Sequence, residues 1–150
     1  MKYQSLKTIW NSLDNNVTDP YQIAKDFDCI VVERKLPKYI LGFTEPISQY
    51  IFINQNLNQR FKKFVVAHEL IHSLIDKSPS YLEVNSSVNT IKKEARANKG
   101  AFFLLLRNFY SIFDINESEF DITDFMKYYQ IPEKYYYFFE QCIKEVKPKK

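Results

Sequence analysis

The sequence contains two histidines, and both lie in the stretch "FVVAHELIHSLI", as His68 and His72. Residues four apart on an α-helix share one face, so the two imidazoles can bind a single ion. Zinc accepts neutral histidine nitrogens, and a catalytic zinc site combines three protein ligands with one water molecule. The spacing therefore predicts that both histidines are ligands of a catalytic zinc ion. Manganese is the alternative ion, since the sequence does not separate the two.

Glu69 directly follows the first histidine and points to the side of the pair. From there its carboxylate can reach a metal-held water but is not placed to be a ligand. A bound metal lowers the pKa of water from about 16 to about 7, so a carboxylate becomes an adequate base. This is the chemistry of the HExxH motif of zinc proteases, and it predicts Glu69 as the catalytic base. The competing interpretation is an amphipathic helix that carries two half-buried histidines, but chance seldom produces this spacing.

A third ligand has to come from another part of the chain. One large class of HExxH proteins has a histidine six residues after the second, and this position is Ser78. Another class takes a glutamate from the next helix, and Glu94 lies 22 residues after His72, beyond a loop long enough to reverse the chain. Asn98 follows one turn later, where its side chain can hold a ligand imidazole from behind. We therefore predict Glu94 as the third ligand and Asn98 as a support for one imidazole.

Asp76 and Glu83 are the alternatives for the third ligand. Asp76 lies one turn past His72 on the same helix, so its direction drifts away from the ion. Glu83 falls in an expected loop, where a carboxylate is normally solvated. Both are weaker candidates than Glu94.

The elements that have to position these residues follow from hydrophobic periodicity and turn signals. A helix over residues 57–76 carries the histidines, and a second long helix starts near Asn89 or Thr90 and runs to about residue 110. Between them lies an expected loop that contains Pro79. The remaining elements are three strands, at 29–34, 38–43 and 49–54, and four further helices, at 5–13, 18–27, 118–130 and 132–146.

The order of helices, then strands, then helices predicts an α+β fold. We expect a small antiparallel three-stranded sheet, covered by the HExxH helix and its neighbours, and a helical C-terminal third. The 150 residues are expected to form a single domain. Its metal-site core spans about 36–110 and its helical C-terminal part about 114–146.

The strand at 49–54 directly precedes the metal helix. Its edge is a candidate for binding an extended substrate by strand addition, the alternative being an ordinary strand paired on both sides. A zinc peptidase also needs a donor for the oxyanion that develops on the attacked carbonyl. Tyr50, Tyr81 and Arg96 are candidates, and the sequence does not choose among them.

Composition excludes several classes of function. The net charge is only +3, and no recognition motif for nucleic acid is present, so we expect no direct binding to DNA or RNA. No apolar run reaches the roughly 18 residues of a membrane span, and the N-terminal stretch lacks the apolar region of a signal peptide. Two distant cysteines fit free thiols. These features predict a cytoplasmic protein without membrane contact.

Two stretches, "IFINQNLNQRFKKFVVAHELIHSLI" and "EARANKGAFFLLL", together resemble the ImmA/IrrE family of zinc metallopeptidases. The resemblance covers about residues 36–106. It implies His68, His72 and Glu94 as zinc ligands and Glu69 as the catalytic base. It further implies a cytoplasmic protein, often from a mobile element or a stress response, that cleaves a helix-turn-helix repressor.

Three positions depart from the family pattern. Ile71 replaces the usual glycine between the histidines, Arg96 stands where glutamate is frequent, and Arg107 replaces a Met-Pro pair after the leucines. None of the three removes a ligand or the base. Ile71 adds bulk near the metal, which is expected to affect substrate approach or activity.

The sequence thus predicts a zinc-dependent endopeptidase that cleaves a regulatory protein, with a helix-turn-helix transcriptional repressor as the expected substrate. The alternative is a metal-bound but non-catalytic module that binds a protein through its aromatic C-terminal helices. The run "YYYFF" at 135–139 motivates this alternative, because five consecutive rings cover every side of a helix. Glu69 favours the peptidase, since a structural zinc site needs no base and normally closes with a fourth protein ligand.

Overall fold

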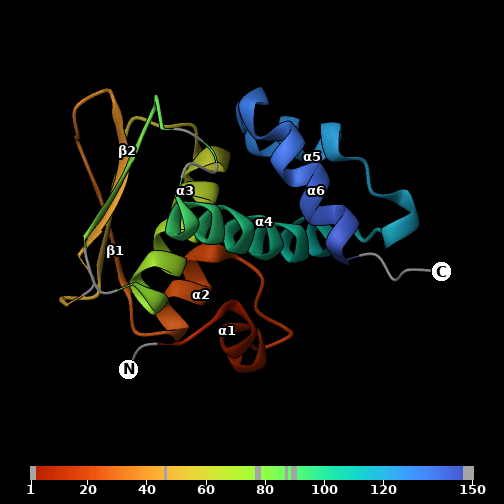
Figure 1. Ribbon diagram of the computed structural model, residues 1–150, viewed down its shortest axis with the longest axis horizontal. Helices are drawn as coiled ribbons and strands as arrows, with labels where there is room; N and C mark the ends of the chain where they lie inside the picture. Colours follow the sequence, from red (N-terminus) through yellow and green to blue (C-terminus); the bar gives the residue numbers. More distant parts are fainter. Residues whose placement is uncertain (1–2, 46, 77–78, 87, 89–90, 147–150) are drawn as a thin grey trace.

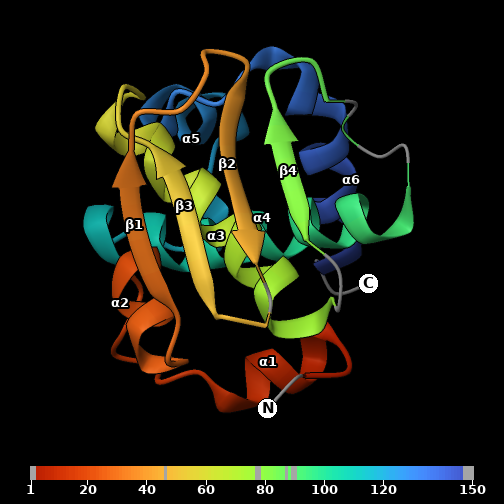
Figure 2. The same ribbon diagram turned by 90° about the vertical axis from the view of Figure 1, so that its left-hand side faces the viewer.

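The computed structural model describes residues 3–45, 47–76, 79–86, 88 and 91–146. A sheet forms one side of the molecule, and the helices lie behind one face of this sheet (Figures 1 and 2). The predicted α+β class and helical C-terminal third are confirmed. In chain order the elements are α1 (Leu6–Ser12), α2 (Pro20–Asp26), β1 (Ile30–Arg34), β2 (Ile40–Glu45), β3 (Tyr50–Asn54), α3 (Gln59–Ile75), β4 (Ser80–Glu83), α4 (Lys92–Phe113), η1 (Glu117–Glu119), α5 (Ile122–Tyr129), η2 (Glu133–Tyr135) and α6 (Tyr136–Val146).

The sheet differs from the prediction in the number and direction of its strands. Its order is β1-β3-β2-β4, with β1 parallel to β3 and β2 antiparallel to both of its neighbours (Figure 2). The expectation of three antiparallel strands was therefore wrong. β2 lies on the far side of β3, so β3 runs beside β1 in the same direction. β4 escapes prediction because its four residues follow Pro79 in a polar stretch, and pairing with β2 makes them a strand.

β3 is a central strand. It pairs with β1 through contacts such as Val31 with Ile51, and with β2 through contacts such as Phe43 with Phe52. Its edges are therefore closed to a substrate, and the expectation of strand addition at 49–54 was wrong. The outer strands of the described sheet are β1 and β4.

Helix α3, which carries the HExxH motif, is packed between the sheet and α4 (Figure 1). It begins after Asn58, whose side chain accepts hydrogen bonds from the backbone of Arg60 and Phe61. Against the sheet it approaches Gly42 closely, since a Cβ added there would lie 2.7 Å from Val65 Cγ1. The enclosure explains why the hydrophobic residues of α3 occur on more than one face.

Helix α4 begins at Lys92, so the predicted start near Asn89 or Thr90 falls outside the described residues. The helix continues to Phe113, beyond the predicted end near residue 110. Asp114 closes it in the left-handed conformation, with φ of 50°. Its length brings both Glu94 and the C-terminal aromatic residues against the rest of the fold.

The contact between α3 and α4 depends on Ile71 and Gly100. Ile71 is fully buried, and a Cβ added at Gly100 would lie 2.6 Å from Ile71 Cγ1. The bulk that Ile71 introduces between the histidines is therefore accommodated by the missing side chain on α4. The packing against Gly100 thus accounts for Ile71, one of the three departures from the family pattern.

The C-terminal third packs through its rings. Phe102 on α4 contacts Phe125 of α5 at 5.3 Å and Phe139 of α6 at 4.6 Å between centroids. Within the run 135–139, Tyr135 and Phe139 are buried, whereas Tyr137 is 77% exposed. The run therefore contributes mainly to the core. No helix in the described part of the chain combines the length and apolar character needed to cross a membrane.

Candidate metal centre

His68 and His72 lie side by side on the buried side of α3. Both are inaccessible to solvent, and their Nε2 atoms are 3.2 Å apart. The two imidazoles thus converge on one point, as the four-residue spacing predicts. Both histidines lie within the continuous α-helix Gln59–Ile75, so their convergence follows from the four-residue spacing.

Glu94 comes from the first turn of α4 and completes the cluster. Its Oε1 lies 3.2 Å from His68 Nε2, and its Oε2 lies 2.7 Å from His72 Nε2. One donor atom from each of the three residues lies within 4.8 Å of the others. Two imidazole nitrogens and one carboxylate oxygen form a donor set that zinc accepts in catalytic sites. The residues therefore fit a divalent metal, and among the described residues no fourth protein ligand joins them.

Asn98 lies behind His68, as predicted. Its Oδ1 is 2.8 Å from His68 Nδ1, and its amide nitrogen donates to the backbone carbonyl of Val88. Because the amide nitrogen is used for Val88, the Oδ1 atom accepts from the imidazole. His68 then carries its proton on Nδ1 and leaves the lone pair of Nε2 for a metal.

Asp76 performs the corresponding task for His72. Its Oδ2 lies 2.6 Å from His72 Nδ1, on the side of the ring opposite Glu94. Arg96 forms an ion pair with the other carboxylate oxygen. Asp76 thus lies behind the His72 imidazole rather than in the cluster, and the ion pair with Arg96 holds it there. The i, i+4 spacing of His72 and Asp76 was the signal in the sequence.

Two further residues define the surroundings of Glu94. Ser80 on β4 donates a hydrogen bond to Glu94 Oε2 at 3.3 Å, a role that sequence reasoning did not find. Glu83 is exposed at the end of β4, and its backbone N–H bonds to Ser86. The structure therefore does not bring Glu83 into the cluster.

Glu69 is fully buried, and neither of its carboxylate oxygens has a hydrogen-bond partner among the described residues. Burial raises the pKa of the Glu69 carboxyl to about 8, an effect that the nearby His72 opposes. A carboxylate in these surroundings holds a proton more firmly than one in water. Without a bound metal, the Glu69 carboxyl is therefore mostly protonated at neutral pH.

The other three groups influence one another. Burial alone would raise the pKa of Glu94, but its contacts with the His68 and His72 imidazoles outweigh this effect and hold the pKa well below its usual range. Burial would lower the pKa of His72, but Asp76 and Glu94 raise it to about 9. For His68 burial prevails, and the pKa is lowered. Without a metal, therefore, Glu94 is an ionised carboxylate. It faces the charged imidazolium of His72 and the neutral imidazole of His68.

The candidates named for the oxyanion lie elsewhere. Tyr50 and Tyr81 are exposed, and each stacks on a phenylalanine of the sheet, with ring centroids 5.9 and 5.2 Å apart. Arg96 is engaged with Asp76. The tyrosines are thus turned to the sheet surface, and Arg96 is held by Asp76, although its Nε has no hydrogen-bond partner among the described residues.

Tyr135 of η2 is nearer to the cluster. The centroid of its ring lies 5.2 Å from that of Phe64, and the Phe64 centroid lies 6.2 Å from that of the His68 ring. Burial, with a contribution from the charge of Glu94, raises the pKa of Tyr135 to about 12. Its hydroxyl therefore remains a donor at neutral pH. The sequence offered no signal for this residue, because it begins a run of five rings.

An HExxH helix against a sheet, with a carboxylate from the following helix, defines a metallopeptidase-like centre. A sequence model described as the IrrE N-terminal-like domain matches residues 3–136. The chain therefore belongs to the ImmA/IrrE family of metallopeptidase domains, which confirms the resemblance seen in the sequence.

A relative from Bacillus phage phi105 bears the name "Uncharacterized immunity region protein 2". It is 30% identical to this chain over 111 residues, which make up 71% of the chain and 70% of the relative. No solved structure matches the chain.

Proposed function

We propose that this chain is a zinc-dependent endopeptidase that cleaves a regulatory protein, with Glu69 as the general base. The observation that carries the proposal is the buried cluster of His68, His72 and Glu94 beside a carboxylate that lacks any partner among the described residues. A structural zinc site would normally have a fourth protein ligand and would have no use for a buried, unpartnered glutamate. The alternative of a non-catalytic binding module therefore receives less support.

In this mechanism His68, His72 and Glu94 would hold the ion. When bound, zinc polarises the scissile carbonyl and lowers the pKa of a water molecule. Glu69 takes the proton of that water and delivers it to the leaving amine. Asn98 and Asp76 keep the imidazoles in the required tautomer and orientation. Tyr135 is our candidate for the donor that stabilises the oxyanion.

The substrate chain is proposed to lie along β4. Among the described strands β4 pairs with β2, so no strand covers its other edge, although the Glu83 backbone N–H and carbonyl at its end bond to Ser86. Its first residue, Ser80, is bonded to Glu94, which places this edge beside the cluster. An extended segment added to β4 would therefore pass the metal ligands. An accessible loop or linker of a folded protein can adopt this conformation.

A helix-turn-helix repressor is the proposed substrate, and the cytoplasm is the proposed location. The phage relative is named for an immunity region, and the ImmA/IrrE resemblance implies the cleavage of a repressor. Peptide-bond hydrolysis at the cluster would inactivate the repressor irreversibly. Zinc is the proposed ion because nitrogen donors predominate in the cluster, and manganese is the second choice.

The test uses the repressor-like protein that is encoded nearest to this gene. Zinc-loaded wild-type protein and Glu69→Gln are each incubated with it, and fragments are identified by mass spectrometry. We expect defined fragments with the wild type alone, since the variant keeps the ligands but lacks the base. Equal cleavage by both proteins would remove Glu69 from the mechanism. Stable binding without cleavage by either would favour the non-catalytic module.

A further inference from the structure

A cavity away from the metal centre is lined by residues of α1, α4 and the end of α6. Its volume is about 490 Å³, within the range of small-molecule sites. Apolar side chains form most of its wall, including Trp10, Phe103, Leu106 and Tyr110. Arg107 of α4 is 13 residues beyond Glu94, about 20 Å along the helix at 1.5 Å per residue. The cavity is therefore distinct from the candidate metal centre.

Arg107 is the unusual group in this cavity. Its Nη2 donates to the backbone carbonyl of Asp14 at 3.1 Å, but its Nη1 is buried and has no hydrogen-bond partner among the described residues. Burial lowers the pKa of the Arg107 guanidinium, and the charge of Asp14 only partly offsets this effect. The group nevertheless stays charged at neutral pH. A partly buried cation with an unused N–H group gains stability when an anion accepts from it.

The other charged groups of the cavity do not neutralise this cation. Lys99 and Glu145 form an ion pair with each other. The Asp14 carboxylate accepts from the backbone of Asn16, and no described carboxylate forms an ion pair with Arg107. Among the residues that line the cavity, the charge left after this pairing is that of Arg107, which the nearby Asp14, outside the lining, offsets only in part. An anion is the ligand that this charge selects.

The apolar wall specifies the rest of the ligand. Trp10 and Phe103 meet edge to face, with centroids 6.1 Å apart at an interplanar angle of 84°. Both rings are only partly buried, so part of each remains open toward the cavity. Aromatic side chains arranged in this way favour another ring.

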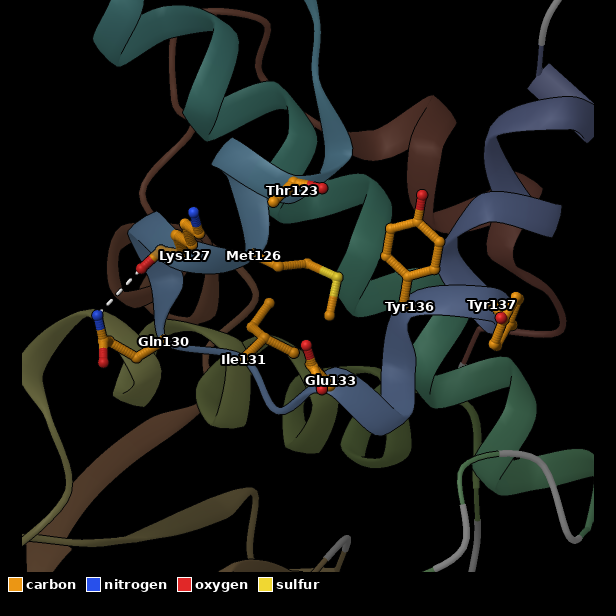
Figure 3. Close-up of a pocket in the computed structure, with 8 residues that line it drawn as sticks. All are labelled: Thr123, Met126, Lys127, Gln130, Ile131, Glu133, Tyr136 and Tyr137. Carbon is orange, nitrogen blue, oxygen red and sulfur yellow. Dashed lines mark hydrogen bonds between the residues drawn. The ribbon is translucent and has the colours of Figure 1, made fainter.

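The cavity shown in Figure 3, between α5 and α6, has no feature that indicates one class of ligand. It is lined by Met126, Ile131 and Tyr136 together with Lys127 and Glu133, which carry opposite charges. None of its described polar side chains is both buried and without a partner. Its shape alone does not indicate an occupant.

We propose that the cavity between α1, α4 and α6 binds a small aromatic carboxylate. The ring of the ligand lies against Trp10 and Phe103, and its carboxylate accepts hydrogen bonds from Arg107. This proposal is independent of the peptidase function, because none of these residues belongs to the metal centre. It gives a role to Arg107, which replaces the Met-Pro pair of the family pattern.

The chain contains one tryptophan, and it lines this cavity, so its indole N–H signal reports occupancy. We would titrate ¹⁵N-labelled protein with 3-phenylpropionate and, in parallel, with the neutral 3-phenylpropanamide at constant ionic strength. A probe of this size is expected to bind with a Kd on the order of 1 mM. The charged contact should make the carboxylate bind roughly tenfold more tightly than the amide. Both probes should shift the Trp10 signal.

Arg107→Gln should abolish the preference for the carboxylate, because glutamine carries no charge and its side chain is shorter than that of arginine. Arg60→Gln is the matched control, since Arg60 lies over Tyr128 on another face and should keep the preference. Equal wild-type affinity for both probes, or an unperturbed Trp10 signal at about 20 mM of 3-phenylpropionate, roughly twenty times the expected Kd, would overturn the proposal. So would a preference that survives in Arg107→Gln. The wild-type comparison decides the matter even if a variant folds poorly.

Discussion

Replacing Gly100 by alanine is expected to destabilise the protein, although alanine is the better helix former. Alanine gains about 1 kcal/mol over glycine in a helix interior. Here, however, the new Cβ would lie 2.6 Å from Ile71 Cγ1, 2.8 Å from Ile71 Cδ1 and 3.0 Å from Leu6 Cδ2. Overpacking in a dense core costs about 1–3 kcal/mol, and two contacts under 3.0 Å put this substitution in the upper part of that range, at about 2–3 kcal/mol. We therefore expect Gly100→Ala to lower the free energy of unfolding by about 1–2 kcal/mol.

The sign of this effect should reverse when Ile71 is shortened. Ile71→Ala alone leaves a cavity and costs about 2–5 kcal/mol. In that background the methyl group that Gly100→Ala adds enters the vacated space, and the helix-forming advantage of about 1 kcal/mol remains. The coupling between the two substitutions should therefore be about 2–3 kcal/mol, at the upper end for residues in contact.

The assay is urea unfolding of the four metal-free proteins, followed by circular dichroism at constant pH. Unchanged m-values would show that the midpoints report stability. A Gly100→Ala substitution that stabilises the wild type, or that has the same effect in both backgrounds, would refute the explanation. In that case the close approach of α3 and α4 would not depend on the glycine.

Three further predictions concern the centre and the sheet. Glu94→Ala should abolish stable zinc binding and Glu83→Ala should not, which metal analysis after gel filtration will show; the reverse would overturn the ligand assignment. The raised pKa of Glu69, about 8 against an ordinary 4.5, means that metal-free wild type loses stability between these pH values, because the unfolded chain releases this proton first. Glu69→Gln avoids this loss, so its advantage in urea unfolding should grow from pH 5 to 8, by up to about 4 kcal/mol, and then level off. A constant difference would contradict the pKa. Gly42→Ala should cost about 3 kcal/mol, because the added Cβ would meet the Phe52 carbonyl at 2.8 Å as well as Val65 at 2.7 Å. Val65→Ala should not rescue it, and thermal unfolding of the double variant tests this.

The parts of the fold that were predicted correctly are those with local signals. The helix over 57–76 has apolar residues at spacings of three and four, and α3 occupies most of that range. Glu94 was predicted from its spacing and from the length of the loop before it, and the structure places it beside the two histidines. Their roles as ligands, and that of Glu69 as base, stay predictions until metal and activity are measured.

The parts that escaped prediction depend on distant contacts. β4 is a strand because β2 lies beside it, and nothing in its own four residues requires that conformation. Asp76 was weighed only as a ligand, because its bond to Arg96 joins two helices whose packing was not yet known. Tyr135 lies near the cluster because its ring packs on Phe64, a residue far from Tyr135 in the sequence. Such placements follow from tertiary packing rather than from local propensity.

The strand order also sets the sequence in which contacts can form during folding. β2 and β3 join through a short connection, whereas pairing of β2 with β4 unites Phe43 with Tyr81, 38 positions along the chain. Closing the larger loop costs more entropy, and α3 has to be formed within it. Ser80 and Glu94 therefore reach the histidines after α3 and the β2–β3 pair are in place. In pulsed hydrogen exchange during refolding, amides of α3 should gain protection before those of β4, and simultaneous protection would contradict this order. Metal should consequently bind tightly only once the whole chain has folded.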